Sequence, residues 1–288
     1  MPKNDRGHAR DDRTVNAMTT DSQHQPAAHP DDRGTATCRI EPRADGEVAW
    51  VTLGHSAKMN AMGSAMMTEL MAILKDLENR HDLRVVVISG AGSRAFVGGA
   101  FVPELFSLTP ETSRAFIYRM HRVFQAVRQC PVPVIAMIRG YCLGAGTELA
   151  AACDIRIADT SAVFGMPEVK VGMPSLIEAA LLPMIVGWGK TREMLMTGAN
   201  YSAAEGKEMG FFEAVCEEAE LDSTIERKIG QIVAAGRQAV RAQKKLINAW
   251  EELKPSERIA LSMDYMEAAF ASGEPHRMMA PFVRKKPR

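Results

Sequence analysis

The sequence predicts an α/β fold with a largely parallel sheet. Segments with strand character alternate with longer segments whose apolar residues recur at helical spacing, which is typical of a parallel sheet covered by helices. The 288 residues are 46% hydrophobic and 24% charged, enough to bury one sizeable core. Because ligands bind such sheets at the carboxyl ends of the strands, we expect a functional site in the loops that follow them.

The first 36 residues are predicted to be a disordered head or an extension outside the fold. They are polar and show almost no aliphatic periodicity. Asp5, Asp11, Asp12 and Asp21 argue against a transit peptide, because such peptides avoid acidic residues.

Strand and helix patterns alternate from Cys38 onward. Residues 47–53 alternate or run apolar as a strand should, and 64–79 carry apolar residues at helical spacing. Residues 85–89 (Val-Val-Val-Ile-Ser) form a continuous apolar run, as expected of a strand buried on both faces. A Gly-rich turn follows this strand.

The pattern continues with a helix over 113–129 and a strand over 132–138, which ends at Gly140. Further short strands are expected at 154–158 and 162–164. From about Thr191 long amphipathic helices dominate, and they are expected at 203–209, 221–235 and 239–253. We therefore divide the chain into the head (1–36), a core that carries the active site (37–190) and a helical C-terminal region (191–288).

Composition narrows the class of function. Lys+Arg 35 balances Asp+Glu 35, so no global charge attracts nucleic acid or an anionic membrane. No apolar run reaches the ~18–20 residues that a bilayer span needs. The five cysteines show no Cys-x-x-Cys pair, which favours a reduced, cytoplasmic compartment. The seven histidines show no metal-ligand spacing, so we predict no metal site.

Two segments that each end in a glutamate indicate acid–base chemistry. Residues 140–148 read Gly-Tyr-Cys-Leu-Gly-Ala-Gly-Thr-Glu, and residues 164–168 read Phe-Gly-Met-Pro-Glu. Small residues lead into a helix start, where backbone N–H groups can face a ligand oxygen. Ala145 and Glu148 are three residues apart and would share one helix face. Alternatively, Glu148 merely favours the positive end of the helix dipole.

These two segments, with residues 57–62 and 94–100, resemble four motifs of the crotonase family, the enoyl-CoA hydratases and isomerases, in the family's order. The resemblance covers roughly residues 38–285. It implies a crotonase-like spiral of repeated ββα units followed by a helical C-terminal oligomerisation region, with trimers paired into hexamers.

The resemblance also implies a reaction and its residues. The backbone amides of Ala100 and Ala145 would form an oxyanion hole for the enolate of an acyl-CoA thioester. Glu148 would activate water for attack at Cβ, and Glu168 would protonate Cα. Enoyl-CoA hydratase is therefore the expected activity. The alternatives are another acyl-CoA reaction of the family, namely Δ3–Δ2 isomerisation, decarboxylation or C–C cleavage, and an RNA-binding role. The candidate segments for RNA binding are the basic run 237–245 and the basic tail 284–288.

Substrate contacts are carried over in the same way, with coenzyme A entering as part of the substrate and no other cofactor expected. The CoA moiety would lie along Ala57, Lys58, Met59 and Ala61, with Lys58 as a phosphate partner or simply a solvated lysine. The remaining expected contacts are Gly98, Phe101, Val102, Gly144, Pro167 and Leu176.

Two departures from the family pattern affect the acyl pocket. Phe101 stands where relatives usually carry Asp, and we expect its ring to narrow or reshape the pocket. Leu176 and Ile177 add bulk where glycines are usual. In the same stretch, Ser175 and Glu178 have the Ser-x-x-Glu spacing of a capping box. We favour that interpretation over a role for Glu178 as a third catalytic acid.

Overall fold

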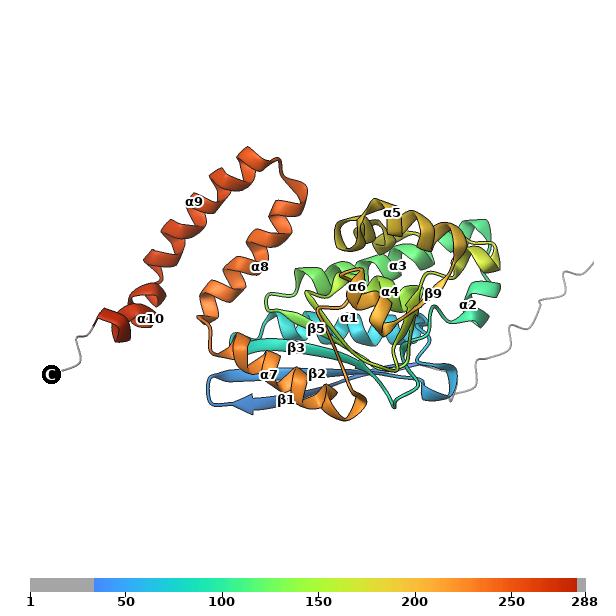
Figure 1. The fold of residues 1–288 in the computed structure, drawn as a ribbon, viewed down its shortest axis with the longest axis horizontal. Helices are drawn as coiled ribbons and strands as arrows, with labels where there is room; N and C mark the ends of the chain where they lie inside the picture. The colour runs from blue at the N-terminus through green and yellow to red at the C-terminus, as the bar shows by residue number, and fades with distance from the viewer. Residues whose placement is uncertain (1–33, 284–288) are drawn as a thin grey trace, which may run out of the picture.

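The computed structural model describes residues 34–283, and its larger sheet has six strands in the order β1-β2-β3-β5-β7-β10 (Figure 1). β1 lies antiparallel to β2, and all other neighbours in this sheet are parallel. The strands are β1 (Thr35–Arg43), β2 (Gly46–Gly54), β3 (Leu83–Gly90), β5 (Val134–Ile138), β7 (Ile155–Asp159) and β10 (Ala214–Cys216).

A second sheet of four short strands has the order β4-β6-β8-β9. Its members are β4 (Ala95–Val97), β6 (Tyr141–Leu143), β8 (Val163–Gly165) and β9 (Asn200–Ser202). The strand pairs β3/β4, β5/β6 and β7/β8 each send their first strand into the larger sheet and their second into the smaller one, and a helix follows each pair. This repetition confirms the predicted spiral of ββα units.

Ten α-helices and several short 3-10 helices complete the described part of the chain. The α-helices are α1 (Ser64–Glu78), α2 (Val102–Phe106), α3 (Pro110–Gln129), α4 (Ala145–Ala152), α5 (Leu182–Thr197), α6 (Ala203–Glu208), α7 (Leu221–Val233), α8 (Arg237–Glu252), α9 (Pro255–Ala271) and α10 (Glu274–Val283). The 3-10 helices are η2 (Ser56–Lys58), η3 (Glu168–Val171), η4 (Ile177–Leu181) and η5 (Glu218–Glu220).

The long predicted elements are present with ends shifted by a few residues, whereas several three-residue strands were not anticipated. β9 and β10 both follow Thr191, so the segment expected to be helical also contributes a strand to each sheet. The division at residue 190 falls inside α5 and stays a prediction. Of the predicted head, residues 1–33 lie outside the described residues, and β1 begins at Thr35.

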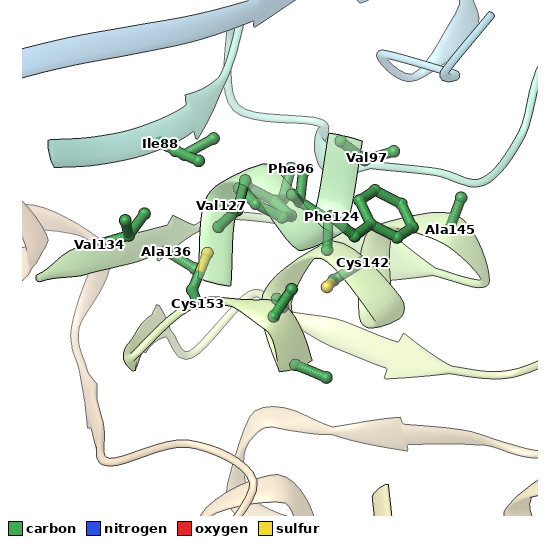
Figure 2. Packing of buried hydrophobic residues seen from close by; sticks show 14 of the residues in the cluster. Ile88, Phe96, Val97, Phe124, Val127, Val134, Ala136, Cys142, Ala145 and Cys153 are labelled. Carbon is green, nitrogen blue, oxygen red and sulfur yellow. The ribbon is translucent and has the colours of Figure 1, made fainter. Parts of the chain in front are cut away.

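β3 is buried on both faces, which explains its continuous apolar run. Val86 and Ile88 belong to the main core between the sheet and helices α1, α3 and α4. Val85 and Val87 face the opposite way, into a smaller cluster that α7 covers with Leu221, Ile225 and Ile229. Figure 2 shows part of the main core, which continues through β5 and β6 to Ala145 at the first turn of α4.

Helices α8 and α9 extend away from the body of the molecule as a hairpin, with α10 at its end (Figure 1). The side chains of the basic run at the start of α8 tie this hairpin to the core. Lys244 Nζ lies 2.6 Å from Asp154 Oδ2, and Arg241 donates to the carbonyl oxygens of Arg80 and Leu83 at 2.9 Å each. Within residues 34–283, no helix combines the length and apolar character that crossing a bilayer requires.

Candidate active site

A cavity of about 430 Å³ lies beside the start of α4, where segments that follow β4, β6 and β8 meet. Most of the residues expected at the site line it: Gly98, Ala100, Val102, Gly144, Ala145, Glu148, Pro167, Glu168 and Leu176. The apolar side chains of Leu105, Leu108, Ile117, Met120, Leu143 and Ile177 make up much of the remaining wall. The cavity therefore joins two carboxylates to a surface suited to an acyl chain.

The backbone amides of Ala100 and Ala145 are both free in this cavity. Ala100 forms a parallel bridge with Met62, in which Gly99 accepts from Met62 and Phe101 donates to it, so the amide of Ala100 faces the other way. Ala145 is the first residue of α4, where no carbonyl precedes it in the helix. Among residues 34–283 neither amide donates a hydrogen bond, so both can serve an oxygen atom in the cavity.

Glu148 lies in the first turn of α4 and is buried, with 5% of its surface exposed. Its Oε1 accepts the backbone N–H of Ala179 at 3.1 Å. Burial raises the pKa of this carboxyl well above its usual value, the charge of Glu168 adds to the increase, and the hydrogen bond from Ala179 opposes it. A carboxyl with a raised pKa is a stronger base once it is ionised.

Glu168 begins η3 and is only half-buried. The hydroxyl of Ser175 donates to its Oε2 at 2.8 Å. The other oxygen, Oε1, lies against Gly144, where a Cβ atom would overlap it. Gly144 has φ of 51° and ψ of −116°, a backbone conformation that favours glycine. The glycine therefore permits both the turn into α4 and the close approach of Glu168.

The segment expected to hold CoA runs beside the cavity without lining it. Gly98 donates to the carbonyl of Met59 at 2.8 Å, which places Met59 behind the cavity wall. Ala57 and Lys58 are exposed, and Ala61 is partly so. The buried side chain of Asn60 holds the segment through the amide of His55 at 2.9 Å and the carbonyl of Ala95 at 2.7 Å. Met59 and Asn60 have φ of 56° and 52°, so this turn is tightly constrained.

The expectation for Phe101 is wrong. Its ring packs against His55, with the ring centroids 5.6 Å apart, and it does not line the cavity. Ala100 and Val102 do line it. Neighbouring side chains in an extended segment point to opposite sides, and the bulk of Phe101 therefore lies on the side away from the acyl pocket.

The capping-box prediction for Ser175 and Glu178 is also wrong. The residue that precedes η4 is Leu176, and no side chain caps this short helix. Ser175 is instead bonded to Glu168, and Glu178 Oε1 lies 2.8 Å from Nδ1 of His121 on α3. Glu178 does not line the cavity that holds Glu148 and Glu168, so it does not occupy the position of a third acid there either.

Sequence reasoning gave no role in the site to Ser113 and Lys170, which line the cavity, or to Ser175, His121 and Asn60, which lie near it. Asn60 was part of a quoted motif, and its buried position between two loops could have been suspected from the motif alone. Nothing in the spacing of Ser175 or His121 indicates their partners, because the contacts form between elements brought together only by folding.

Comparison with known proteins agrees with this geometry. The family model for enoyl-CoA hydratase/isomerase matches residues 43–288. The chain belongs to this family. A short-chain enoyl-CoA hydratase of Clostridium acetobutylicum is 30% identical over 84% of this chain and 93% of the relative. A crotonyl-CoA hydratase of Syntrophomonas wolfei is 28% identical over 83% of this chain and 93% of the relative.

Solved structures of the family share the fold over most of the chain. The enoyl-CoA hydratase of Bacillus anthracis has a TM-score of 0.77 at 30% identity, covering 81% of this chain and 91% of the other. That of Thermoplasma volcanium has a TM-score of 0.79 at 28% identity, covering 86% and 97%. The α/β spiral of this family member is thus the crotonase fold.

Proposed function

We propose that the protein is an enoyl-CoA hydratase that adds water across the 2,3 double bond of an α,β-unsaturated acyl-CoA thioester. The observation that carries this proposal is that two carboxyl groups, Glu148 and Glu168, line the same cavity as two free backbone amides. The names of the relatives support the same activity. Coenzyme A enters as part of the substrate, and the proposal needs no other cofactor.

In this mechanism the amides of Ala100 and Ala145 bind the thioester oxygen. Addition at Cβ moves the π electrons of the double bond toward that oxygen and creates an enolate. Two preorganised donors stabilise this charge more than they stabilise the ground-state carbonyl, which lowers the barrier. The positive end of the α4 dipole adds to the effect at Ala145.

The two carboxyl groups move the protons. The reaction starts from the form of the site in which the two carboxyl groups hold one proton and that proton is on Glu168, so the raised pKa of Glu148 must be overcome for this form to exist. Glu148 then takes a proton from water as the water oxygen bonds to Cβ, and Glu168 gives its proton to Cα as the enolate collapses. One proton is taken up and one is delivered, so the sum is the addition of H₂O. Oε1 of Glu148 is occupied by the amide of Ala179, which leaves Oε2 for the water. Oε2 of Glu168 is occupied by Ser175, which leaves Oε1 to carry the proton.

The CoA moiety is proposed to lie along Ala57, Lys58, Met59 and Ala61. This segment is exposed in part and is hydrogen-bonded to the strand end that leads to Ala100. Ammonium groups bind phosphate well, and exposed Lys58 is the proposed partner of a CoA phosphate.

A substrate panel tests the proposal. The absorbance of the double bond conjugated to the thioester of crotonyl-CoA should fall on incubation with the enzyme, and 3-hydroxybutyryl-CoA should appear as the product. A 3-enoyl-CoA and a malonyl-type thioester test the isomerase, decarboxylase and lyase alternatives. If crotonyl-CoA is not hydrated while one of these thioesters is turned over, the hydratase proposal is wrong.

We also propose a cytoplasmic enzyme that self-associates into trimers or hexamers and does not act on nucleic acid. All five cysteines carry free thiols, as a reducing compartment favours.

Self-association is supported by large apolar side chains that are exposed in the single chain. They belong to α9 and α10 and are Ile259, Met263, Met266 and Phe282, and their exposure favours burial against other copies. Arg237, Arg241 and Lys244 of the basic run bind to groups within the chain, and the basic tail 284–288 lies outside the described residues. Light scattering that gave only the monomer mass would contradict the proposed assembly. Binding of an RNA probe at physiological salt would contradict the proposal that the protein does not act on nucleic acid.

A further inference from the structure

A second cavity, of about 360 Å³, lies behind η4 on the side away from the proposed catalytic cavity. Ile177 lines both cavities, so η4 is the wall between them. Ile177 has φ of 33°, a conformation that is rare for a β-branched residue. Such a backbone conformation costs free energy and persists only where surrounding contacts stabilise it, so the contacts of η4 hold Ile177 in place.

Glu178 is the main polar contact of this wall. Its side chain is 4% exposed, and Oε1 lies 2.8 Å from Nδ1 of His121, a residue of α3 that is partly open to the second cavity. Oε2 is buried and has no hydrogen-bond partner among residues 34–283. A buried carboxylate with one oxygen unpartnered is costly, which calls for an explanation beyond packing.

The same short helix holds Glu148. The residue after Glu178 is Ala179, whose backbone N–H donates to Oε1 of Glu148 at 3.1 Å. The bond between His121 and Glu178 ties η4 to α3, and the bond from Ala179 ties η4 to α4. Any displacement of Glu178 therefore moves the donor that orients the proposed general base.

We propose that Glu178, held by His121, is a positioning residue for Glu148: it fixes the amide that orients Glu148 and places a carboxylate behind it. The inference rests on the proposed hydratase function, in which Glu148 activates water. Because Glu178 lines only the second cavity, it acts through Glu148 without touching substrate.

The charges around Glu148 and Glu178 determine in which direction Glu178 shifts the pKa of Glu148. Burial is the largest cause of the raised pKa of Glu148, followed by Glu168, and Glu178 also raises it. Burial raises the pKa of Glu178 as well, whereas His121 and Arg128 lower it. Glu168 on η3 acts on Glu148, His121 and Arg128 on α3 act on Glu178, and Glu252 of α8 lines the second cavity beside Glu178. Helix α5 also packs against η4, but its Lys190 and Glu193 pair with one another and its Arg192 lies over the ring of Trp188. On β6, burial raises the pKa of the Cys142 thiol to about 12. β4 carries no titratable side chain.

The first test is Glu178→Gln, which keeps the shape and removes the charge. Without that carboxylate Glu148 ionises more readily, so the acidic limb of the pH profile of kcat/KM should move to lower pH. Glu208→Gln, at an exposed position of α6, is the matched control and should leave the limb in place. An unshifted limb in a folded Glu178→Gln enzyme, or the same shift in the control, would overturn the inference.

A double-mutant cycle tests the role of His121. His121→Gln should alter the pH profile when Glu178 is present and should have little further effect in the Glu178→Gln background, because its partner carboxylate is gone. His81→Gln, at an exposed histidine, is the control. Equal effects of His121→Gln in both backgrounds would show that the histidine does not act through Glu178.

A titration of the Glu148 carboxyl, which does not depend on catalytic turnover, separates this inference from the proposed function. In enzyme labelled with carbon-13 at glutamate carboxyls, the resonance missing from Glu148→Gln identifies Glu148, and its titration should move to lower pH in Glu178→Gln. If the wild-type enzyme fails to hydrate crotonyl-CoA yet this titration shifts, the hydratase proposal fails and the coupling stands. If the wild-type enzyme is active and the titration does not shift, the inference itself fails.

Discussion

The hydroxyl of Ser175 donates a hydrogen bond to Oε2 of Glu168 at 2.8 Å. Glu168 begins a 3-10 helix and is only half-buried, so its side chain needs a second contact to hold one orientation. Ser175 supplies it from one side, and the close contact with Gly144 limits movement on the other. The proton donor proposed for Cα is thus held between a hydroxyl and a glycine.

Ser175→Ala should lower kcat on crotonyl-CoA by roughly 10-fold while changing KM little, because the lost bond orients a reacting group and does not bind CoA. Steady-state kinetics measure both constants. Ser223→Ala, which removes an exposed hydroxyl bonded to the carbonyl of Glu220, is the control. A kcat equal to that of the wild type would show that Glu168 does not depend on Ser175.

Gly144→Ala should lower turnover by about 10²-fold or more, because the new Cβ would displace Oε1 of Glu168. The backbone conformation at Gly144, with φ of 51° and ψ of −116°, adds a cost of about 1–3 kcal/mol to the free energy of unfolding of the alanine variant. Chemical denaturation and crotonyl-CoA kinetics measure the two effects. Gly92→Ala is a useful comparison, since Gly92 also has positive φ but its Cβ would meet nothing within 4 Å. Equal losses of activity in both variants would contradict the steric explanation.

Glu148→Gln and Glu168→Gln should each lower hydratase turnover by roughly 10²–10⁴-fold, since each removes one of the two proton-transfer groups. Binding of a CoA product should stay within about 10-fold, because neither carboxyl is proposed to hold CoA. Calorimetric titration with 3-hydroxybutyryl-CoA measures the second quantity. Near-wild-type turnover in either variant would refute the two-acid mechanism.

Glu148→Gln should also stabilise the fold at neutral pH. The pKa of Glu148 is raised by burial, so its ionisation in the folded state costs free energy that the unfolded chain does not incur. This cost is absent below the unfolded pKa of about 4.3, grows as the pH rises toward the folded pKa, and is constant above it. The difference in free energy of unfolding between variant and wild type should therefore increase from pH 4 to pH 8. A difference that did not depend on pH would show that Glu148 is not buried as described.

The long elements of the fold could be predicted because hydrophobic periodicity is a local property. The apolar run of β3 reflects burial on both faces, and α1 and α3 are long enough for their apolar stripes to repeat several times. β4, β6, β9 and β10 each have three residues, too few for any period to be recognised. Their pairing is specified by the path of the whole chain.

For the candidate site, too, local features could be predicted from the sequence and contacts between distant residues could not. The sequence alone selected Glu148, Glu168 and the small residues before them as candidates, because the chemistry expected of each segment is contained in consecutive residues, and these residues line one cavity. Only the tertiary structure decided what surrounds them. Spacing suggested that Ser175 and Glu178 were partners of one another, yet they bond to Glu168 and to His121, the latter 57 residues away in the chain. The direction of the Phe101 ring was likewise decided by packing against His55. A hydrogen bond or a ring contact forms with whatever group the fold brings within a few ångströms, and a linear pattern does not contain that distance.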